Sequence, residues 1–271
     1  SRDWSSDVCS SDLMRVLVAD AFEQSGLDGL KAAGCDVVFQ PGLKDAALRD
    51  AIASTAADVL VVRGTAVTAE MLAAGVLSLI VRAGAGYNTI DVAEASRRGI
   101  YVSNCPGKNA VAVAELTMGL MLALDRRVPD NVAELRAGHW NKKEFSKARG
   151  VYGRTLGLIG FGNIGHEVAR RALAFGLRVV VWSRRFADPA QVPDLPVEVL
   201  GSPDAVAAAS DIVSVHLALS KDTRGLLGAA FFAAMKPGAM FLNTARGEVV
   251  DYAALEAAVR ARGLRVGLDV Y

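Results

Sequence analysis

Short apolar runs rich in β-branched residues alternate along this chain with stretches in which apolar positions recur every three or four residues. The short runs are apolar throughout rather than at every second position, which is typical of parallel strands covered on both faces. In the first half, strands are expected at residues 16–19, 37–39, 59–62, 79–82 and 101–103, with helices such as 43–53 and 69–74. In the second half, strands are expected at 155–159, 178–182, 212–217, 240–243 and 265–270, with helices such as 164–175 and 252–261. The pattern therefore predicts an α/β fold of two domains.

The domain boundary is expected where the alternation of strands and helices is interrupted. Residues 109–138 predict one or two long helices with a break near Pro129, and a polar, basic connection follows at 139–147. We therefore expect a flavodoxin-like α/β unit at 14–108 and a second α/β unit at 109–271.

The first residues do not share the pattern of the rest. Residues 1–13 are polar, lack periodicity and contain no apolar segment of the signal-peptide type. We interpret them as a non-native tail and leave them out of the fold prediction. A native disordered tail is the alternative.

The second half opens with Gly-x-Gly-x-x-Gly between an apolar run and a helical pattern. Gly160 allows a tight turn, Gly162 lets backbone N–H groups approach a phosphate, and Gly165 allows the helix to pack closely on the strand. The helix start at Asn163 and Ile164 supplies further unpaired N–H groups. This context predicts a Rossmann domain that binds the pyrophosphate of a dinucleotide.

The residues after the next expected strand bear on the choice between NAD and NADP. NAD-specific folds place Asp or Glu about 20 residues past the glycines, where it holds the ribose 2′-hydroxyl. This chain has Ser183, Arg184 and Arg185 there, and no carboxylate before Asp188. A hydroxyl and two guanidiniums favour the 2′-phosphate of NADP. NAD is the alternative, because either arginine can point into solvent.

Composition argues against several classes of partner. A formal net charge of +1, from 30 basic and 29 acidic residues, gives no electrostatic reason to expect nucleic acid or an anionic membrane. No run reaches the roughly 18 apolar residues of a membrane span, and the nearest, 110–124, is interrupted by Glu115 and Thr117. The cysteines lack metal-ligand spacing and cannot all pair, which indicates a reducing, cytoplasmic compartment and no metal site; they are Cys9, Cys35 and Cys105.

Further motifs follow one another in order, and together they resemble the D-isomer-specific 2-hydroxyacid dehydrogenases from Met14 to the last residue. They are Arg-Ala-Gly-Ala-Gly-Tyr-Asn at 82–88, Asn-Cys-Pro-Gly-Lys-Asn at 104–109, Asp-Ile-Val-Ser-Val-His at 211–216 and Asn-Thr-Ala-Arg-Gly at 243–247. The resemblance implies a substrate domain at 14–108 and an NAD(P)-binding Rossmann domain at 109–271.

The resemblance also implies roles for single residues. Hydride transfer between nicotinamide and a 2-keto acid requires a cation that holds the carboxylate and polarises the carbonyl, and a guanidinium does both with a planar, permanent charge. Arg246 matches the family's catalytic arginine, and the backbone N–H groups of Ala85 and Gly86 match the loop that holds the substrate carboxylate. The matching cofactor contacts are Thr117, His216, Thr244, Ala245 and Asp269.

Within the family, the sequence at 104–109, which resembles the interdomain hinge, and the sequence at 140–147 are most similar to those of the phosphoglycerate dehydrogenases, which carry out the first step of serine synthesis. Arg63 and Arg82 match basic positions that face the phosphorylated substrate, and Asn104 joins them in the expected substrate site. An NADP-dependent glyoxylate or hydroxypyruvate reductase is the alternative, since the loop at 63–68 is short and weakly basic. A non-catalytic dinucleotide-sensing module is the alternative from a different class.

The resemblance implies a proton donor as well, a histidine in a Pro-His context held by a glutamate, and both lie in relatives beyond the end of this sequence. His139, His166 and His216 do not match that position. We therefore expect a fragment that is truncated at its C-terminus, incomplete in its Rossmann domain and without useful dehydrogenase activity. The resemblance further implies a homodimer formed through 139–147 and the apolar face of 111–124, and packing in the core of the same chain is the alternative for that face.

Overall fold

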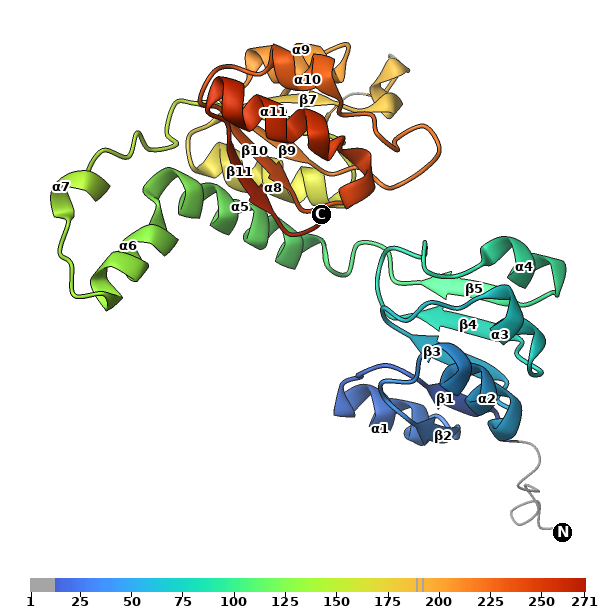
Figure 1. The fold of residues 1–271 in the computed structure, drawn as a ribbon. Helices are drawn as coiled ribbons and strands as arrows, with labels where there is room; N and C mark the ends of the chain where they lie inside the picture. The colour runs from blue at the N-terminus through green and yellow to red at the C-terminus, as the bar shows by residue number, and fades with distance from the viewer. Residues whose placement is uncertain (1–12, 189, 192) are drawn as a thin grey trace, which may run out of the picture. The chain divides into compact units, whose positions relative to one another are not determined.

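The structure, a computed structural model, describes residues 13–188, 190–191 and 193–271. The described chain divides into two compact units, one ending at Lys108 and the other comprising Asn109–Tyr271. Each unit contains its own parallel sheet flanked by helices (Figure 1), which confirms the expected α/β class. The tail interpreted at 1–13 lies, apart from Leu13, outside the described residues. Within the described part of the chain, no helix has the length and apolar character needed to cross a membrane.

The first unit contains a five-stranded sheet in the order β2-β1-β3-β4-β5, with every pair parallel. This order is that of flavodoxin-like folds. Its strands are β1 (Arg15–Val18), β2 (Asp36–Phe39), β3 (Val59–Val62), β4 (Leu79–Arg82) and β5 (Tyr101–Asn104). Its helices are α1 (Gln24–Ala32), α2 (Asp45–Thr55), α3 (Ala69–Ala73) and α4 (Val92–Arg97).

Both faces of this sheet are packed, which explains why its strands are apolar at successive positions. Leu17 and Leu60 belong to a core formed with Ile52 of α2. Val16 and Val59, on the opposite face, pack with Leu27 of α1. Successive side chains of a strand point to opposite faces, so a strand with a core on each side cannot alternate apolar and polar residues.

The second unit contains a six-stranded sheet in the order β11-β10-β9-β6-β7-β8, again with every pair parallel. Its strands are β6 (Thr155–Ile159), β7 (Arg178–Trp182), β8 (Glu198–Val199), β9 (Ile212–Val215), β10 (Met240–Asn243) and β11 (Arg265–Leu268). One face packs against α5 (Ala110–Arg126) and α8 (Asn163–Ala174). The other face packs against α9 (Pro203–Ala209), α10 (Ala229–Ala234) and α11 (Tyr252–Arg262).

Two details of the helical segment differ from the sequence-based expectation. The break expected near Pro129 falls at Arg127, whose φ of 51° ends α5, and Pro129 lies in the first turn of α6 (Val128–Arg136). Proline fits there because the first N–H groups of a helix have no intrahelical acceptor. The polar stretch expected as a connection contains a short helix, α7 (Lys142–Phe145).

Two strands of the second unit are shorter than expected. β9 ends at Val215 instead of residue 217, and β11 ends at Leu268 instead of residue 270. In both cases a polar residue, His216 or Asp269, follows the last paired position, and the next apolar residue extended the predicted strand beyond its true end. The residues that follow these ends belong to the site described below.

Candidate dinucleotide and 2-hydroxyacid site

The glycine loop between β6 and α8 has the backbone geometry that its three glycines allow. Gly160 has a φ of 101°, and a Cβ placed there would lie 2.4 Å from the carbonyl oxygen of His216. A Cβ on Gly165 would lie 2.4 Å from the carbonyl oxygen of Gly160, so this glycine lets α8 pack against the loop. A Cβ on Gly162 would meet no atom within 4 Å. The loop is therefore crowded on its inner side and open at Gly162.

The open side of the loop suits a phosphate group. Gly162 is the N-cap residue of α8, which begins with Asn163 and Ile164. The first N–H groups of a helix have no intrahelical acceptor, and together with the helix dipole they attract an anion. The residues present therefore fit the pyrophosphate of a dinucleotide.

His216 forms part of the wall beneath this loop. It follows β9, and its Nε2 lies 2.9 Å from the hydroxyl oxygen of Ser214. Burial lowers the pKa of His216 to about 3, so its imidazole is neutral at physiological pH. The residue is half-buried, and its neutral imidazole contributes packing and a hydrogen bond but cannot donate a proton as an imidazolium would.

The loop after β10 is held by Asn243, a fully buried residue. Its Nδ2 donates a 2.9 Å hydrogen bond to the carbonyl oxygen of Arg246, and its Oδ1 accepts the N–H of Ala245 at 3.0 Å. These two bonds fix the turn from which the Arg246 side chain extends. The sequence analysis included Asn243 only as the first residue of the motif at 243–247 and did not predict that it positions the loop. Its place at the end of an apolar strand is the signal that could have identified it, because a buried amide needs hydrogen-bond partners.

Two of the residues expected to contact the dinucleotide are in direct contact with each other. The hydroxyl oxygens of Thr117, on α5, and Thr244, after β10, lie 3.0 Å apart, and both residues are buried. The Thr117 hydroxyl also donates to the carbonyl oxygen of Val113. Residues 127 positions apart in the sequence are thus joined next to the loop that carries Arg246.

Asp269 lies at the same sheet edge. It follows β11, and its backbone N–H donates to the carbonyl oxygen of Asn243 at 3.0 Å. Since β11, β10, β9 and β6 are parallel neighbours, their carboxyl ends share one edge. Arg246, Asp269, His216 and the glycine loop therefore lie along the edge at which open α/β sheets bind ligands.

The residues after β7 are arranged in two different ways. The Nη1 of Arg184 lies 2.9 Å from a carboxylate oxygen of Asp222, and both side chains are exposed. The guanidinium of Arg185 lies 4.8 Å from the ring centre of Phe186 and 5.3 Å from that of Phe161, inside the glycine loop. One guanidinium is therefore paired with a carboxylate, and the other is packed on aromatic rings. Ser183 precedes them as the N-cap residue of the short helical turn Arg184–Ala187.

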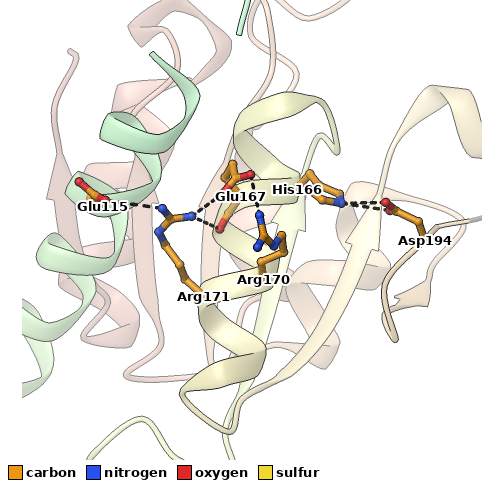
Figure 2. Close-up of polar contacts among 6 residues, drawn as sticks. All are labelled: Glu115, His166, Glu167, Arg170, Arg171 and Asp194. Carbon is orange, nitrogen blue, oxygen red and sulfur yellow. Dashed lines mark hydrogen bonds and ion pairs between the residues drawn. The ribbon is translucent and has the colours of Figure 1, made fainter. Parts of the chain in front are cut away.

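Polar contacts tie the first turns of α8 to neighbouring segments (Figure 2). His166 Nε2 contacts both carboxylate oxygens of Asp194, at 3.0 and 3.1 Å, and this hydrogen bond holds the pKa of Asp194 below its usual value. Arg171 pairs with Glu167 on its own helix and with Glu115 on α5. These contacts stabilise α8 against α5 and against the segment that follows β7.

In the first unit, Asp20 holds the loop that carries Arg63. One carboxylate oxygen of Asp20 accepts the N–H groups of Arg63, Gly64 and Thr65 at 2.6, 3.0 and 3.1 Å, and the other accepts the Thr65 hydroxyl at 2.8 Å. Burial alone would raise the pKa of Asp20, but these hydrogen bonds outweigh it and the pKa is lowered. Sequence analysis missed this residue, since its partners are more than 40 positions away.

The expected substrate loop follows β4 and is tied to the end of β5. Asn104 Nδ2 donates to the carbonyl oxygen of Ala85 at 2.6 Å. The Arg82 guanidinium lies against Gly84, where a Cβ would come within 1.5 Å of its Nη1. Gly84 therefore leaves the room that Arg82 occupies, and the N–H groups at Ala85 and Gly86 lie in a loop anchored by Asn104. Among the described residues, no cluster of three or more His, Cys, Asp or Glu side chains could hold a metal ion.

The fold and the glycine loop thus define a dinucleotide-binding α/β protein. A family model described as "D-isomer specific 2-hydroxyacid dehydrogenase, NAD binding domain" matches residues 118–271. The chain belongs to this family of oxidoreductases, as its motifs predict.

Curated relatives of the chain carry different enzyme names. The chain is 46% identical over 218 residues to a hydroxypyruvate reductase of Thermotoga maritima, covering 79% of this chain and 69% of that protein. It is 38% identical over 263 residues to a D-3-phosphoglycerate dehydrogenase of Methanocaldococcus jannaschii, covering 96% of this chain and 49% of that protein. The chain therefore spans about half the length of such phosphoglycerate dehydrogenases.

Solved structures share the fold over almost the whole chain. The TT0316 protein of Thermus thermophilus superimposes with a TM-score of 0.84 at 37% identity, covering 95% of this chain and 82% of that one. A 3-phosphoglycerate dehydrogenase of Entamoeba histolytica, solved with NAD+, gives 0.80 at 29% identity, with 96% and 81% covered. An acyclic imino acid reductase, solved with NADPH and D-Arg, gives 0.83 at 27% identity, with 95% and 83% covered.

Proposed function

We propose that this chain provides the dinucleotide site and the substrate-holding loops of an NAD(P)-dependent dehydrogenase that interconverts a 2-hydroxy acid and a 2-keto acid. The observation that carries the proposal is the buried Asn243, which fixes the Arg246 loop on the sheet edge that also bears the glycine loop. A bound nicotinamide would accept or supply the hydride. The protein would contribute the groups that bind and orient the acid.

Arg246 would act on the substrate through its permanent positive charge. A guanidinium can hold a carboxylate with two parallel hydrogen bonds, and its charge polarises a neighbouring carbonyl group. Thr117, Thr244, Ala245 and Asp269 would contact the dinucleotide at the same edge of the sheet. The N–H groups of Ala85 and Gly86, in the first unit, would hold the substrate carboxylate.

The substrate pair we propose first is 3-phosphoglycerate and its 2-keto form, the first reaction of serine synthesis. Several relatives that align with 95% or more of this chain carry the name D-3-phosphoglycerate dehydrogenase. Arg63 follows β3 and Arg82 ends the adjacent β4, and both would bind the phosphate, while Asn104 holds the loop that follows Arg82.

An NADP-dependent hydroxypyruvate or glyoxylate reductase is the second candidate. The 46% identity to a hydroxypyruvate reductase supports it, as does the absence of a carboxylate directly after β7. Ser183, Arg184 and Arg185 would bind the 2′-phosphate, so NADP is the cofactor that we propose in either case. Tighter binding of NADH than of NADPH would contradict this choice.

We further propose that the 271-residue polypeptide binds dinucleotide without useful turnover, because none of its histidines is placed as a proton donor. His139 is exposed and lies 3.8 Å from Glu134, and His166 is engaged by Asp194. His216 is half-buried, and its lowered pKa keeps it neutral. Measurable hydride transfer by this polypeptide would contradict the proposal.

Binding experiments separate these possibilities. NADPH fluorescence would report dinucleotide binding, and its further change on adding phosphohydroxypyruvate, hydroxypyruvate or glyoxylate would report the ternary complex. We expect Arg246→Gln to abolish the response to the acids while NADPH still binds. If no acid binds the dinucleotide complex of the unaltered chain, the dehydrogenase proposal fails and a dinucleotide-sensing module becomes the better description.

A homodimer is also proposed, through residues 139–147 and the outer face of α5. Val111 and Leu116 on α5 are exposed, although the same helix buries Met118 and Met121 in the core. Contiguous exposed apolar surface marks interaction sites, and we propose that these two side chains belong to one. Sedimentation would test this proposal, and a monomer at micromolar concentration would contradict it.

We propose a reducing, cytoplasmic location for the protein. Cys35 and Cys105, the two cysteines within the described residues, are free thiols. Cys9 lies outside the described residues. Recovery of the protein in an extracellular fraction would contradict this location.

A further inference from the structure

A basic pocket lies in the unit formed by residues 109–271, away from the dinucleotide site. It has a volume of about 260 Å³. One of its residues, Arg265, begins β11, whereas the glycine loop follows the end of β6. Because these strands belong to one parallel sheet, the pocket and the loop lie at opposite sheet edges. The cationic side chains that line the basic pocket are Arg126, Arg127, Lys147, Arg149 and Arg265.

The carboxylates of the basic pocket are already engaged. Asp125 accepts the N–H of Gly150 at 2.9 Å and pairs at 3.2 Å with Arg154, which is buried with it. Glu144 pairs with Arg127 at 2.8 Å and with Lys147 at 2.5 Å. Five cations thus face two carboxylates, an excess of three positive charges, and neither carboxylate pairs with the other three arginines.

Those three arginines have little to neutralise them. Within the described part of the chain, the side chains of Arg126 and Arg149 make no hydrogen bond or ion pair. Arg265 donates only to the carbonyl oxygen of Leu124, at 3.4 Å. The negative end of the α5 dipole accounts for one such cation at the last turn. The helix dipole does not account for three guanidiniums around the basic pocket.

The positive charge of the basic pocket also acts on the neighbouring Arg154. Burial is the larger cause that lowers the pKa of Arg154, and the positive charge of Arg149 lowers it further. Repulsion of this kind is relieved when an anion enters between the guanidiniums. The cluster is therefore arranged as a receptor for negative charge, and structural ion pairing does not explain it.

We propose that the basic pocket binds a small, multiply charged anion through a phosphate group, either inorganic phosphate or a small phosphate monoester. Guanidiniums recognise phosphate oxygens with paired hydrogen bonds, and their charge is permanent. A water molecule occupies about 30 Å³ of liquid, so the pocket has room for a phosphate group and a few waters. A dinucleotide would not fit.

Titration of inorganic phosphate into the whole chain, saturated with NADPH to fill the glycine loop, tests the proposal. Calorimetry should detect a site whose Kd rises at least tenfold in the double variant Arg126→Gln/Arg149→Gln. The control is Arg49→Gln/Arg97→Gln, which removes the same two charges from exposed positions in the other unit. We expect this control to bind phosphate as the unaltered chain does. Equal affinity in all three proteins, or equal weakening in both variants, would overturn the proposal.

Two further measurements keep the test decisive. Phosphate should raise the unfolding temperature of the unaltered chain and of the control more than chloride does at equal ionic strength, and it should not do so for the double variant. Glycerol phosphate binding as tightly as inorganic phosphate would identify a monoester ligand, and its failure to bind would identify inorganic phosphate. A double variant that binds phosphate normally but sediments as a smaller species would show that the pocket is a protein interface, which overturns the proposal.

Discussion

Asn243 and Arg246 are joined by a 2.9 Å hydrogen bond from the side-chain amide of the first to the backbone carbonyl of the second. The oxygen of the same amide accepts the N–H of Ala245 at 3.0 Å. One buried side chain therefore provides hydrogen-bond partners for both a backbone carbonyl and a backbone N–H of the turn. The arginine expected to bind substrate is therefore positioned by its backbone, and its guanidinium stays available apart from a contact with the Ala245 carbonyl.

Replacing Asn243 with alanine should destabilise the second unit. The substitution leaves the Ala245 N–H and the Arg246 carbonyl without their partners in a buried place, and each such loss costs about 1–3 kcal/mol. We expect a decrease of about 2–4 kcal/mol in the free energy of unfolding, measured by urea denaturation. Asn141→Ala, at an exposed position of the same unit, is the control and should change little. An unchanged midpoint for Asn243→Ala would show that the turn does not depend on this amide.

The three glycines of the loop should respond differently to alanine. Gly160→Ala combines a φ of 101° with a 2.4 Å approach to a backbone oxygen, and Gly165→Ala makes a similar approach, so each should lower stability by more than about 2 kcal/mol. Gly162→Ala meets open space and should stay within about 1 kcal/mol of the unaltered chain. Its Cβ would occupy the side from which phosphate approaches, so dinucleotide affinity should fall at least tenfold. Calorimetry would measure dinucleotide affinity, and thermal unfolding would measure stability. A larger loss of stability in Gly162→Ala than in Gly160→Ala or Gly165→Ala would contradict this prediction.

The half-buried His216 should make the free energy of unfolding depend on pH in a defined window. The pKa of His216 is about 3 in the folded chain, against about 6.5 when unfolded, so the unfolded state binds the proton first as pH falls. The stabilisation is fully present above pH 6.5 and is lost progressively between pH 6.5 and about 3, by up to about 1.4 kcal/mol per pH unit.

Denaturation of the unaltered chain and of His216→Gln at pH 7.5 and pH 5 would measure this effect. Glutamine keeps a hydrogen-bond donor for Ser214 and does not titrate. The difference between the two proteins should therefore shrink or reverse at pH 5. A constant difference at both pH values would show that His216 does not titrate between the folded and unfolded states.

The strands, and the loops that follow their carboxyl ends, could be predicted because the sequence patterns that identify them are local. Apolar runs such as Val59–Val62 identify strands, and the glycine spacing at 160–165 identifies the loop between strand and helix. The groups that hold these loops could not be predicted in the same way. Asp20 reaches a loop more than 40 residues away, and Arg184 pairs with Asp222, 38 residues away. Such partners depend on which strands become neighbours, and a single sequence does not contain that information locally.

The pair of Arg184 and Asp222 leads to a prediction about cofactor choice that rests on the proposed NADP preference. If Arg184 binds the 2′-phosphate, Asp222 competes with it, since the two side chains lie 2.9 Å apart at an exposed site. Asp222→Asn should therefore tighten NADPH binding a few-fold, and Arg184→Gln should weaken it by a similar or larger factor. Both variants should leave the Kd of NADH nearly unchanged, because NADH has no 2′-phosphate. Titration of both cofactors into both variants measures this, and parallel changes for NADH and NADPH would show that the pair acts on the loop and not on the phosphate.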